Sequence, residues 1–422
     1  MPAALAVFAE SRASPKYRPR RPEDSVLHRI LREHLNSFLS EARDNHARGL
    51  PKYVEQEFRA YLECGIPAYG FALAHCRDCG LDIVVAFSCK KRGACPSCNA
   101  RRMSNTAANL ADRVFPDERV RQWVLTVPFE LRLLLASRAD ALTLVSRVFV
   151  DEIFRWQRAR AASTGALKSR GGAVAFHHRF GGSLNLHVHF HVCVLDGVYT
   201  ASDDGGPGRF LPAPAPDAMD LQEITQTVHV RVVRWLRKRG LLADFDDDGS
   251  PVEPSEPSAL DACLQGSLGV GKLVELKEPG VLSTGESQQS DEAPAPRIRE
   301  RGRHARDGNG YSIHAGVVVE VGDAAGRERL FRYCGRGPFA LDRLSVSREG
   351  LVVYKVRNPW KRSQTHRVMT PLEFLARMSA LIPPPRHPLV RFHGVLAPHS
   401  AWRKQIVPAS VSASAASEPS CE

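Results

Sequence analysis

The chain has 422 residues, of which 43% are hydrophobic and 25% are charged, the composition of an ordinary soluble globular protein. This length predicts two or three domains, and no apolar run reaches the roughly 18 to 20 residues of a membrane span. The N-terminus lacks the features of a signal peptide, so we expect a cytoplasmic protein that does not contact a membrane. The net charge of +12 favours a polyanionic partner such as nucleic acid.

The spacing of apolar residues predicts the elements in chain order, after a Pro- and Arg-rich start that we expect to be disordered. Helices are predicted over 24–48, 51–63, 101–115, 130–161, 217–240, 260–276, 327–334 and 371–382. Strands are predicted over 122–127, 171–180, 184–195, 344–356 and 366–369. Because Gly181, Gly182 and Ser183 separate two strands, they predict a hairpin. This order predicts an α+β protein built around an antiparallel sheet.

Cysteines are concentrated in the N-terminal part, where six of the ten fall between residues 64 and 98. In a cytoplasmic chain such clustering indicates a metal site rather than disulfides. Two CxxC pairs separated by 15 residues have the spacing of a zinc ribbon. Cys64 and Cys89 are left over, and Cys89 is either a small buried apolar residue or an alternate ligand. The spacing predicts a closed, structural zinc site formed by Cys76, Cys79, Cys95 and Cys98.

Three histidines alternate with apolar residues in the run Leu186 to Leu195. The side-chain period of a strand is two, so His187, His189 and His191 lie on one face. Three imidazoles on one face are costly to bury without a partner, and a divalent metal would bind them. The alternative interpretation is a solvated strand face that carries spare histidines.

A metal held on a strand suits phosphoryl transfer, and a tyrosine hydroxyl is a candidate nucleophile for DNA strand cleavage. Tyr333 ends a predicted helix, with Arg329 one turn before it and Arg336 just beyond it. The alternative for Tyr333 is a core residue of an amphipathic helix. Arg101 and Arg102 follow the second CxxC pair and are candidates for contacts with DNA phosphates.

Taken together, these motifs resemble the zinc-binding rolling-circle transposases of the HUH superfamily, the group related to common-region insertion elements. The matching stretches are Cys76–Gly80, Ala86–Lys90, Cys95–Cys98, Arg101–Met103, Arg121–Leu125, Leu184–Tyr199, Arg332–Cys334 and Leu389–Pro398.

The resemblance implies a helical zinc-ribbon domain followed by an HUH endonuclease domain with a central antiparallel sheet flanked by helices. The expected divisions are a disordered basic tail at 1–23, the zinc-binding domain at 24–116, the nuclease domain at 117–382 with polar inserts near 241–258 and 284–310, and a C-terminal segment and tail at 383–422.

The resemblance also implies a DNA transposase that nicks single-stranded DNA at the ends of an insertion sequence and forms a 5′-phosphotyrosine at Tyr333. His189 and His191 align with the HUH pair that holds Mg²⁺ or Mn²⁺, and His187 is a possible third ligand. The expected partners are single-stranded DNA at element ends and target DNA, in a nucleoid-associated protein.

Some relatives carry two tyrosines one helical turn apart, whereas positions 329 and 337 here are Arg and Gly. This sequence is therefore expected to act with a single tyrosine. Two alternatives remain at the level of sequence. One is a plasmid replication initiator or relaxase with the same chemistry, and the other is a non-catalytic, zinc-dependent DNA-binding protein.

Overall fold

The computed structural model describes residues 21–77, 80–163, 165–166, 168–203, 205–242, 258–269, 304–356 and 365–408. The basic N-terminal segment, most of both polar inserts and most of the C-terminal tail that the sequence predicts lie outside the described residues. None of the described helices combines the length and the apolar character that a membrane span requires.

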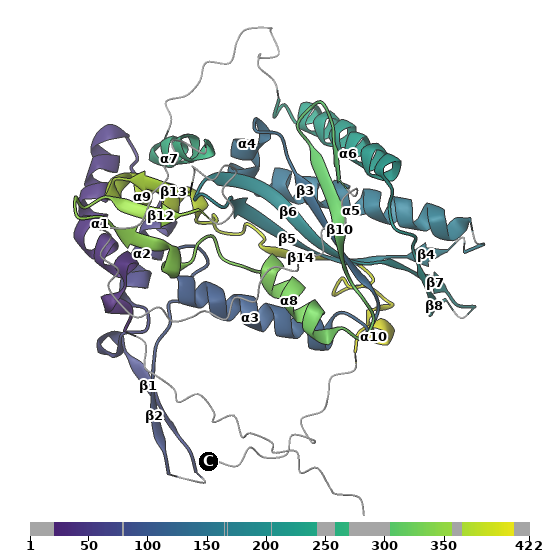
Figure 1. Ribbon diagram of the computed structural model, residues 1–422, viewed down its shortest axis with the longest axis horizontal. Coiled ribbons are helices and arrows are strands. Elements are labelled where there is room, and N and C mark those ends of the chain that lie inside the picture. Colours follow the sequence, from purple (N-terminus) through teal and green to yellow (C-terminus); the bar gives the residue numbers. More distant parts are fainter. Residues whose placement is uncertain are drawn as a thin grey trace, which may run out of the picture.

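A six-stranded antiparallel sheet forms the centre of the molecule (Figure 1). Its strand order is β14 (Val390–Gly394), β5 (Gly172–Phe180), β6 (Leu186–Leu195), β3 (Val120–Thr126), β10 (Ser312–Val319) and β9 (His304–Arg306). Strands β5 and β6 form the predicted hairpin, and β3 pairs with β6 as its other neighbour. The predicted α+β class with a central antiparallel sheet is therefore confirmed.

Helices cover both faces of this sheet (Figure 1). One face packs against α5 (Ala139–Ala162), on which α6 (Ala218–Lys238) lies, and the other against α3 (Pro96–Arg113) and α8 (Ala324–Cys334). In β6, Phe190 and Val192 belong to the apolar core that contains α5, whereas Cys193 and Leu195 belong to the core that contains α3 and α8. Because side chains alternate along a strand, the odd-numbered histidines of β6 face α8.

The N-terminal helices pack against elements from the end of the chain. Helix α1 (Val26–Asn45) contacts α9 (Pro371–Leu381), α7 (Ala259–Leu268), β11 (Leu344–Val346) and α2 (Lys52–Glu63). One apolar core runs from Leu27 to Ile382 through these elements. The division between 116 and 117 stays a prediction. The remaining strands of this side are β12 (Val352–Lys355) and β13 (His366–Met369), which extend β11 into a small sheet.

Several predicted elements differ in their bounds: α7 ends at Leu268 and α8 begins at Ala324, and three others differ for clear physical reasons. The helix predicted over 130–161 is two helices, α4 (Leu131–Ser137) and α5, because Arg138 between them has extended backbone. The strand predicted over 344–356 is a hairpin that turns at Gly350, whose φ of 80° suits glycine. Helix α3 begins at Pro96 rather than 101, because the Cys95 thiol caps it by accepting a hydrogen bond from the Cys98 amide.

Several short elements complete the described part of the chain, and three of them, β4, β7 and β8, form a three-stranded sheet. They are η1 (Pro22–Asp24), η2 (Pro67–Tyr69), β4 (Ser169–Arg170), β7 (Gly197–Ala201), β8 (Pro207–Pro212), η3 (Leu341–Arg343) and α10 (Arg403–Ile406).

A two-stranded hairpin, β1 (Phe71–His75) and β2 (Asp82–Ala86), extends away from the body of the molecule (Figure 1). Every residue of β1 is exposed, including the large apolar side chains of Phe71 and Leu73. The hairpin therefore contributes little to either core, and the apolar periodicity that predicts packed strands did not detect it.

Candidate metal centres and active site

Three histidines from two neighbouring strands gather on the face of the sheet that α8 covers. His178 of β5, His189 and His191 of β6 each present one ring nitrogen, and these nitrogens lie within 4.8 Å of one another. The strand register produces this arrangement, because His178 pairs with His189 and His191 follows two residues later on the same face. All three side chains are buried, at 3–7% exposure.

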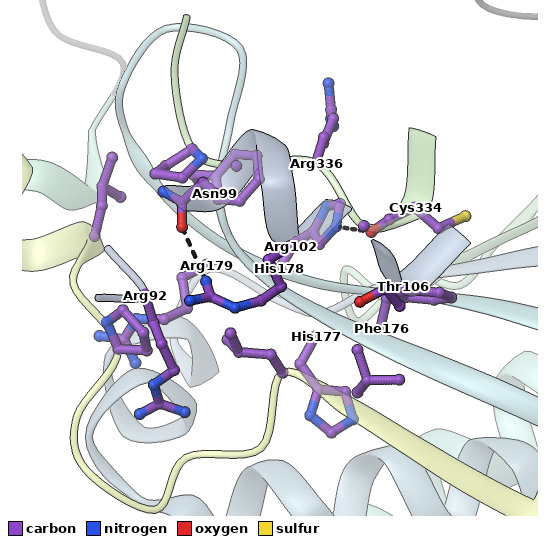
Figure 2. A pocket seen from close by; sticks show the side chains of 18 residues that line it. Arg92, Asn99, Arg102, Thr106, Phe176, His177, His178, Arg179, Cys334 and Arg336 are labelled. Carbon is purple, nitrogen blue, oxygen red and sulfur yellow. Dashed lines mark hydrogen bonds between the residues drawn. The ribbon is translucent and has the colours of Figure 1, made fainter. Parts of the chain in front are cut away.

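Hydrogen bonds select which nitrogen of each ring can bind a metal. The Cys334 carbonyl oxygen lies 2.6 Å from Nε2 of His178 (Figure 2), so Nε2 donates and the buried Nδ1 keeps its lone pair without another partner. Nδ1 of His189 similarly donates to the His187 carbonyl at 2.9 Å, which leaves Nε2 of His189 as the donor atom for a cation.

Gln122 of β3 contacts the third imidazole. Its side-chain amide lies 2.9 Å from Nδ1 of His191, and Nε2 of His191 is buried without a hydrogen-bond partner. A metal at this Nε2 requires a proton on Nδ1. The amide nitrogen of Gln122 faces Nδ1 in the structure, so rotation of the amide places its oxygen there to accept a hydrogen bond from Nδ1–H. The same amide lies 3.2 Å from the Cys334 thiol, so it also contacts the residue that follows Tyr333.

Burial keeps these rings neutral at physiological pH. Desolvation lowers the pKa of His178 to about 3 and lowers the pKa of both His189 and His191 well below the usual value of histidine. Neutral imidazoles are the form that binds divalent transition-metal ions. The unpartnered nitrogens and the donor set therefore fit a divalent cation, with open positions for water and phosphate oxygens.

His187 lies beside this cluster and is not part of it. Its ring centroid is 4.9 Å from that of His189, and its Nδ1 contacts Nδ1 of His189 at 3.1 Å. The sequence-based interpretation named His187 as the possible third ligand, but the structure brings His178 into that position. The reason is the hairpin register, which places a residue of the neighbouring strand closer to the pair than the next residue of the same strand.

Tyr333 approaches the histidine cluster from α8. Its ring lies 5.4 Å from the ring of His191 between centroids, with the two planes nearly perpendicular. The helix is fixed by Arg327, which pairs with Asp117 at 2.8 Å, and by the ring of Phe331, which packs 4.7 Å from that of Phe115. Tyr311, by contrast, is fully buried in the opposite core, and burial raises the pKa of its phenol.

The four arginine candidates occupy different surroundings. The guanidinium of Arg336 lies 4.9 Å from the centroid of the Tyr333 ring. Arg329 lies on the same helix and approaches Asp323 at 3.9 Å on the surface. In α3, Arg101 is exposed, whereas the Arg102 guanidinium is held by carbonyl oxygens of the preceding loop.

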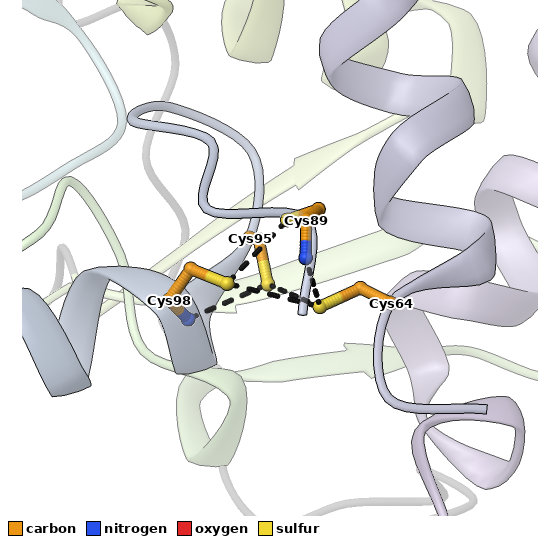
Figure 3. A group of neighbouring side chains, drawn as sticks. All are labelled: Cys64, Cys89, Cys95 and Cys98. Carbon is orange, nitrogen blue, oxygen red and sulfur yellow. Dashed lines mark hydrogen bonds between the residues drawn. The ribbon is translucent and has the colours of Figure 1, made fainter. Parts of the chain in front are cut away.

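A second cluster consists of four cysteines in the N-terminal part: Cys64, Cys89, Cys95 and Cys98 (Figure 3). Sγ–Sγ distances are 3.7 Å for Cys64 and Cys98, 3.5 Å for Cys89 and Cys98, and 3.7 Å for Cys64 and Cys95. Four thiolates around zinc, with bonds of about 2.3 Å, are separated by about 3.8 Å. The cluster therefore has the dimensions of a tetrahedral zinc site without an open position.

The cluster differs from the ligand set inferred from the CxxC spacing. Cys95 and Cys98 are in the cluster, but Cys76 lies past the end of β1, where its amide donates to the Leu81 carbonyl in the hairpin turn. Cys79 lies outside the described residues. Cys76 lies in the hairpin and outside the cluster, whereas Cys64 lies at the end of α2 and Cys89 in the loop that follows β2.

The loop between Cys89 and Cys95 is held by a buried carboxylate. Glu57 of α2 accepts hydrogen bonds from the amides of Arg92, Gly93 and Ala94 at 3.1 to 3.2 Å. Hydrogen bonding to neighbouring thiols, Cys89 first, lowers the pKa of Cys64 to about 7. A thiolate is therefore accessible near neutral pH, which is the state that binds zinc.

Sequence reasoning missed His178 of the histidine cluster and Gln122, which contacts the cluster. His178 lies in the strand predicted over 171–180, next to another histidine. The sequence therefore showed a histidine on the neighbouring strand, but only the strand register shows that His178 pairs with His189. Gln122 had no signal of its own, because its role depends on the pairing of β3 with β6.

Two protein-family models match the chain. A family model for the Y2_Tnp transposases matches residues 172–404, which is more than half of the chain and includes the histidine cluster and Tyr333. A second model, for the transposase zinc-binding domain Zn_Tnp_IS91, matches residues 30–127, which contain the cysteine cluster. No curated protein and no solved structure gives a match. The chain therefore belongs to the IS91-type family of zinc-binding transposases.

Proposed function

We propose that this transposase cleaves single-stranded DNA at the ends of its element by attack of the Tyr333 hydroxyl on a phosphodiester bound at the histidine cluster. The observation that carries the proposal is the position of the Tyr333 ring, 5.4 Å from the ring of His191, beside three imidazoles whose ring nitrogens lie within 4.8 Å of one another. The family assignment favours a transposase over a plasmid initiator or a non-catalytic DNA-binding protein.

A divalent cation held by His178, His189 and His191 would polarise the phosphate and stabilise its developing charge. The Tyr333 oxygen forms a bond to phosphorus as the bond from phosphorus to the 3′ oxygen breaks. The leaving oxygen takes a proton and becomes a free 3′-hydroxyl, and the 5′ end stays on the tyrosine as a phosphodiester. Attack by another 3′-hydroxyl reverses these steps and rejoins strands, as rolling-circle transposition requires.

The cysteine cluster has a structural role in this proposal. Its four thiolates fill a tetrahedral shell and leave no position for substrate. Zinc there holds α2, the loop that follows β2 and the start of α3 together. Helix α3 packs on α8, which carries Tyr333, so the zinc site supports the helix that presents the nucleophile.

Covalent adduct formation tests the proposal. Purified protein is incubated with 3′-labelled single-stranded DNA of an element end, with and without Mn²⁺, and resolved under denaturing conditions. We expect labelled protein only with the cation, and its loss in Tyr333→Phe. Tyr69→Phe is the matched control, because it removes the same hydroxyl from an exposed position. An adduct that persists in Tyr333→Phe would contradict the assignment of the nucleophile.

A further inference from the structure

A cavity of about 70 Å³ lies beside His178, between the zinc-binding segment and the nuclease sheet. The α3 side chains of Asn99, Arg102 and Thr106 line it from one side (Figure 2). Strand β5 and the residues after α8 line it from the other side. Residues 30–127 and 172–404, which match two different family models, therefore line the same cavity.

Among the described residues, those that line the cavity include cationic groups and no carboxylate. Its guanidinium groups belong to Arg92, Arg102, Arg179 and Arg336. Arg102 donates to the carbonyl oxygens of Lys91 at 2.9 Å and Lys90 at 3.2 Å, and to Oδ1 of Asn99 at 3.1 Å. Neutral oxygens fix the direction of a guanidinium without cancelling its charge. The cavity therefore attracts an anion.

Apolar and aromatic side chains also line the cavity. Phe176, Phe180 and Pro338 contribute to the walls, and the Arg336 guanidinium lies 5.6 Å from the centroid of the Phe180 ring. A small inorganic anion would gain nothing from contact with apolar and aromatic side chains. A nucleotide combines a phosphate that pairs with guanidinium groups and a base that stacks on aromatic rings and on arginine.

We propose that this cavity binds one nucleotide of the single-stranded substrate next to the cleaved phosphate, with Arg102 contacting the nucleotide's phosphate. Helix α3 of the zinc-binding segment then contacts the DNA directly, in addition to packing against α8, which carries Tyr333. This inference rests on the proposed function, because the position beside His178 defines which nucleotide the cavity receives.

Two neighbouring arginines of α3 provide a matched test. Arg101→Gln and Arg102→Gln each remove one positive charge, but only Arg102 lines the cavity. Binding of a fluorescent single strand is measured over a range of salt concentrations without added Mg²⁺ or Mn²⁺. We expect Arg102→Gln to weaken binding about tenfold and to lower the salt slope by about one phosphate contact, roughly 0.7, with a smaller effect of Arg101→Gln. Equal effects of the two variants would overturn the proposal.

Abasic substitutions locate the bound base. A set of strands, each lacking one base, is scanned against the wild type, and one position is expected to lose about tenfold in affinity. Thr106→Trp fills the cavity, so it weakens binding of the intact strand and removes the extra loss at that position, whereas Thr106→Ser preserves it. Zinc content and thermal melting confirm that the variants fold.

The outcomes separate this inference from the proposed function. A wild-type protein that shows no sensitive abasic position, or a Thr106→Trp variant with unchanged sensitivity, refutes the cavity site even when the Tyr333 adduct forms normally. A wild-type protein that forms no adduct refutes the proposed chemistry, whatever the binding measurements show.

Discussion

The two clusters of metal-binding side chains are assembled in different ways. All four cysteines come from one short segment, residues 64–98, and lie at helix ends and in a loop. The three histidines come from paired strands, and the tyrosine beside them comes from a helix far along the chain. The cysteine cluster is closed, whereas the histidine cluster leaves coordination positions open. A site that only stabilises the fold can be local, but a site that orients a substrate and a nucleophile depends on the whole sheet.

The largest expected effect separates the two clusters by stability. Cys98→Ser removes a thiolate from the closed site, so it should lose the zinc of this cluster and lower the melting temperature by more than about 10 °C. Cys76→Ser is the control from outside the cluster and should keep both values. Metal analysis and calorimetry provide the measurement. Loss of zinc in Cys76→Ser would contradict this ligand set and favour the one inferred from the CxxC spacing.

The next effect distinguishes the third ligand of the histidine cluster. His178→Ala should weaken Mn²⁺ binding at least about 100-fold, because it deletes one of three donor atoms. Loss of a group that only supports a ligand costs up to about 100-fold, and loss of a ligand itself should cost no less. His187→Ala should change it less than about threefold and leave zinc unaffected. Calorimetric titration with Mn²⁺ measures both. If the two effects are reversed, the third ligand lies on β6 rather than on β5.

A smaller effect is expected at Gln122, which orients His191 without holding the metal. Gln122→Leu removes the acceptor for Nδ1–H and should weaken Mn²⁺ binding about 10- to 100-fold. Gln122→Glu retains an acceptor and should restore most of the affinity. The zinc content of both variants should equal that of the wild type. Unchanged Mn²⁺ affinity in Gln122→Leu would show that His191 needs no such support.

The smallest effect is expected at Glu57, the corresponding support of the cysteine cluster. Glu57→Gln replaces one of the two acceptor oxygens by a donor group, so at least one of the three amides loses its acceptor, and the change should cost about 1–3 kcal/mol of unfolding free energy. Denaturant unfolding measures this loss, and Mn²⁺ affinity should not change. A loss of Mn²⁺ affinity in Glu57→Gln would show that a change at the cysteine cluster also affects the histidine cluster.

The sequence predicted the hairpin at the centre of the sheet better than the strands that lie nearer the edges of the sheet. Alternating apolar residues and the glycine-rich turn predicted the hairpin of β5 and β6, because both signals are local. Strands β10 and β14 were missed, since each joins the sheet from a distant part of the chain. The exposed hairpin of β1 and β2 was missed because none of its faces is packed against a core.

The same distinction applies to the site residues. The alternation of His189 and His191 and the pair Cys95 and Cys98 were visible as short motifs, and the structure places each pair in a cluster. His178, Cys64 and Cys89 complete these clusters through tertiary contacts that spacing does not encode. Tyr333 was distinguished by its arginine neighbours, yet only the packing of α8 on the sheet places its ring beside His191.

The most direct test of the central claim is to identify the residue that becomes attached to DNA. The adduct formed by the wild-type protein with single-stranded DNA and Mn²⁺ is digested with nuclease and protease and mapped by mass spectrometry. The account predicts one phosphotyrosine-linked nucleotide, on the peptide that contains Tyr333. A nucleotide on any other tyrosine, or DNA cleavage without a covalent adduct, would contradict it.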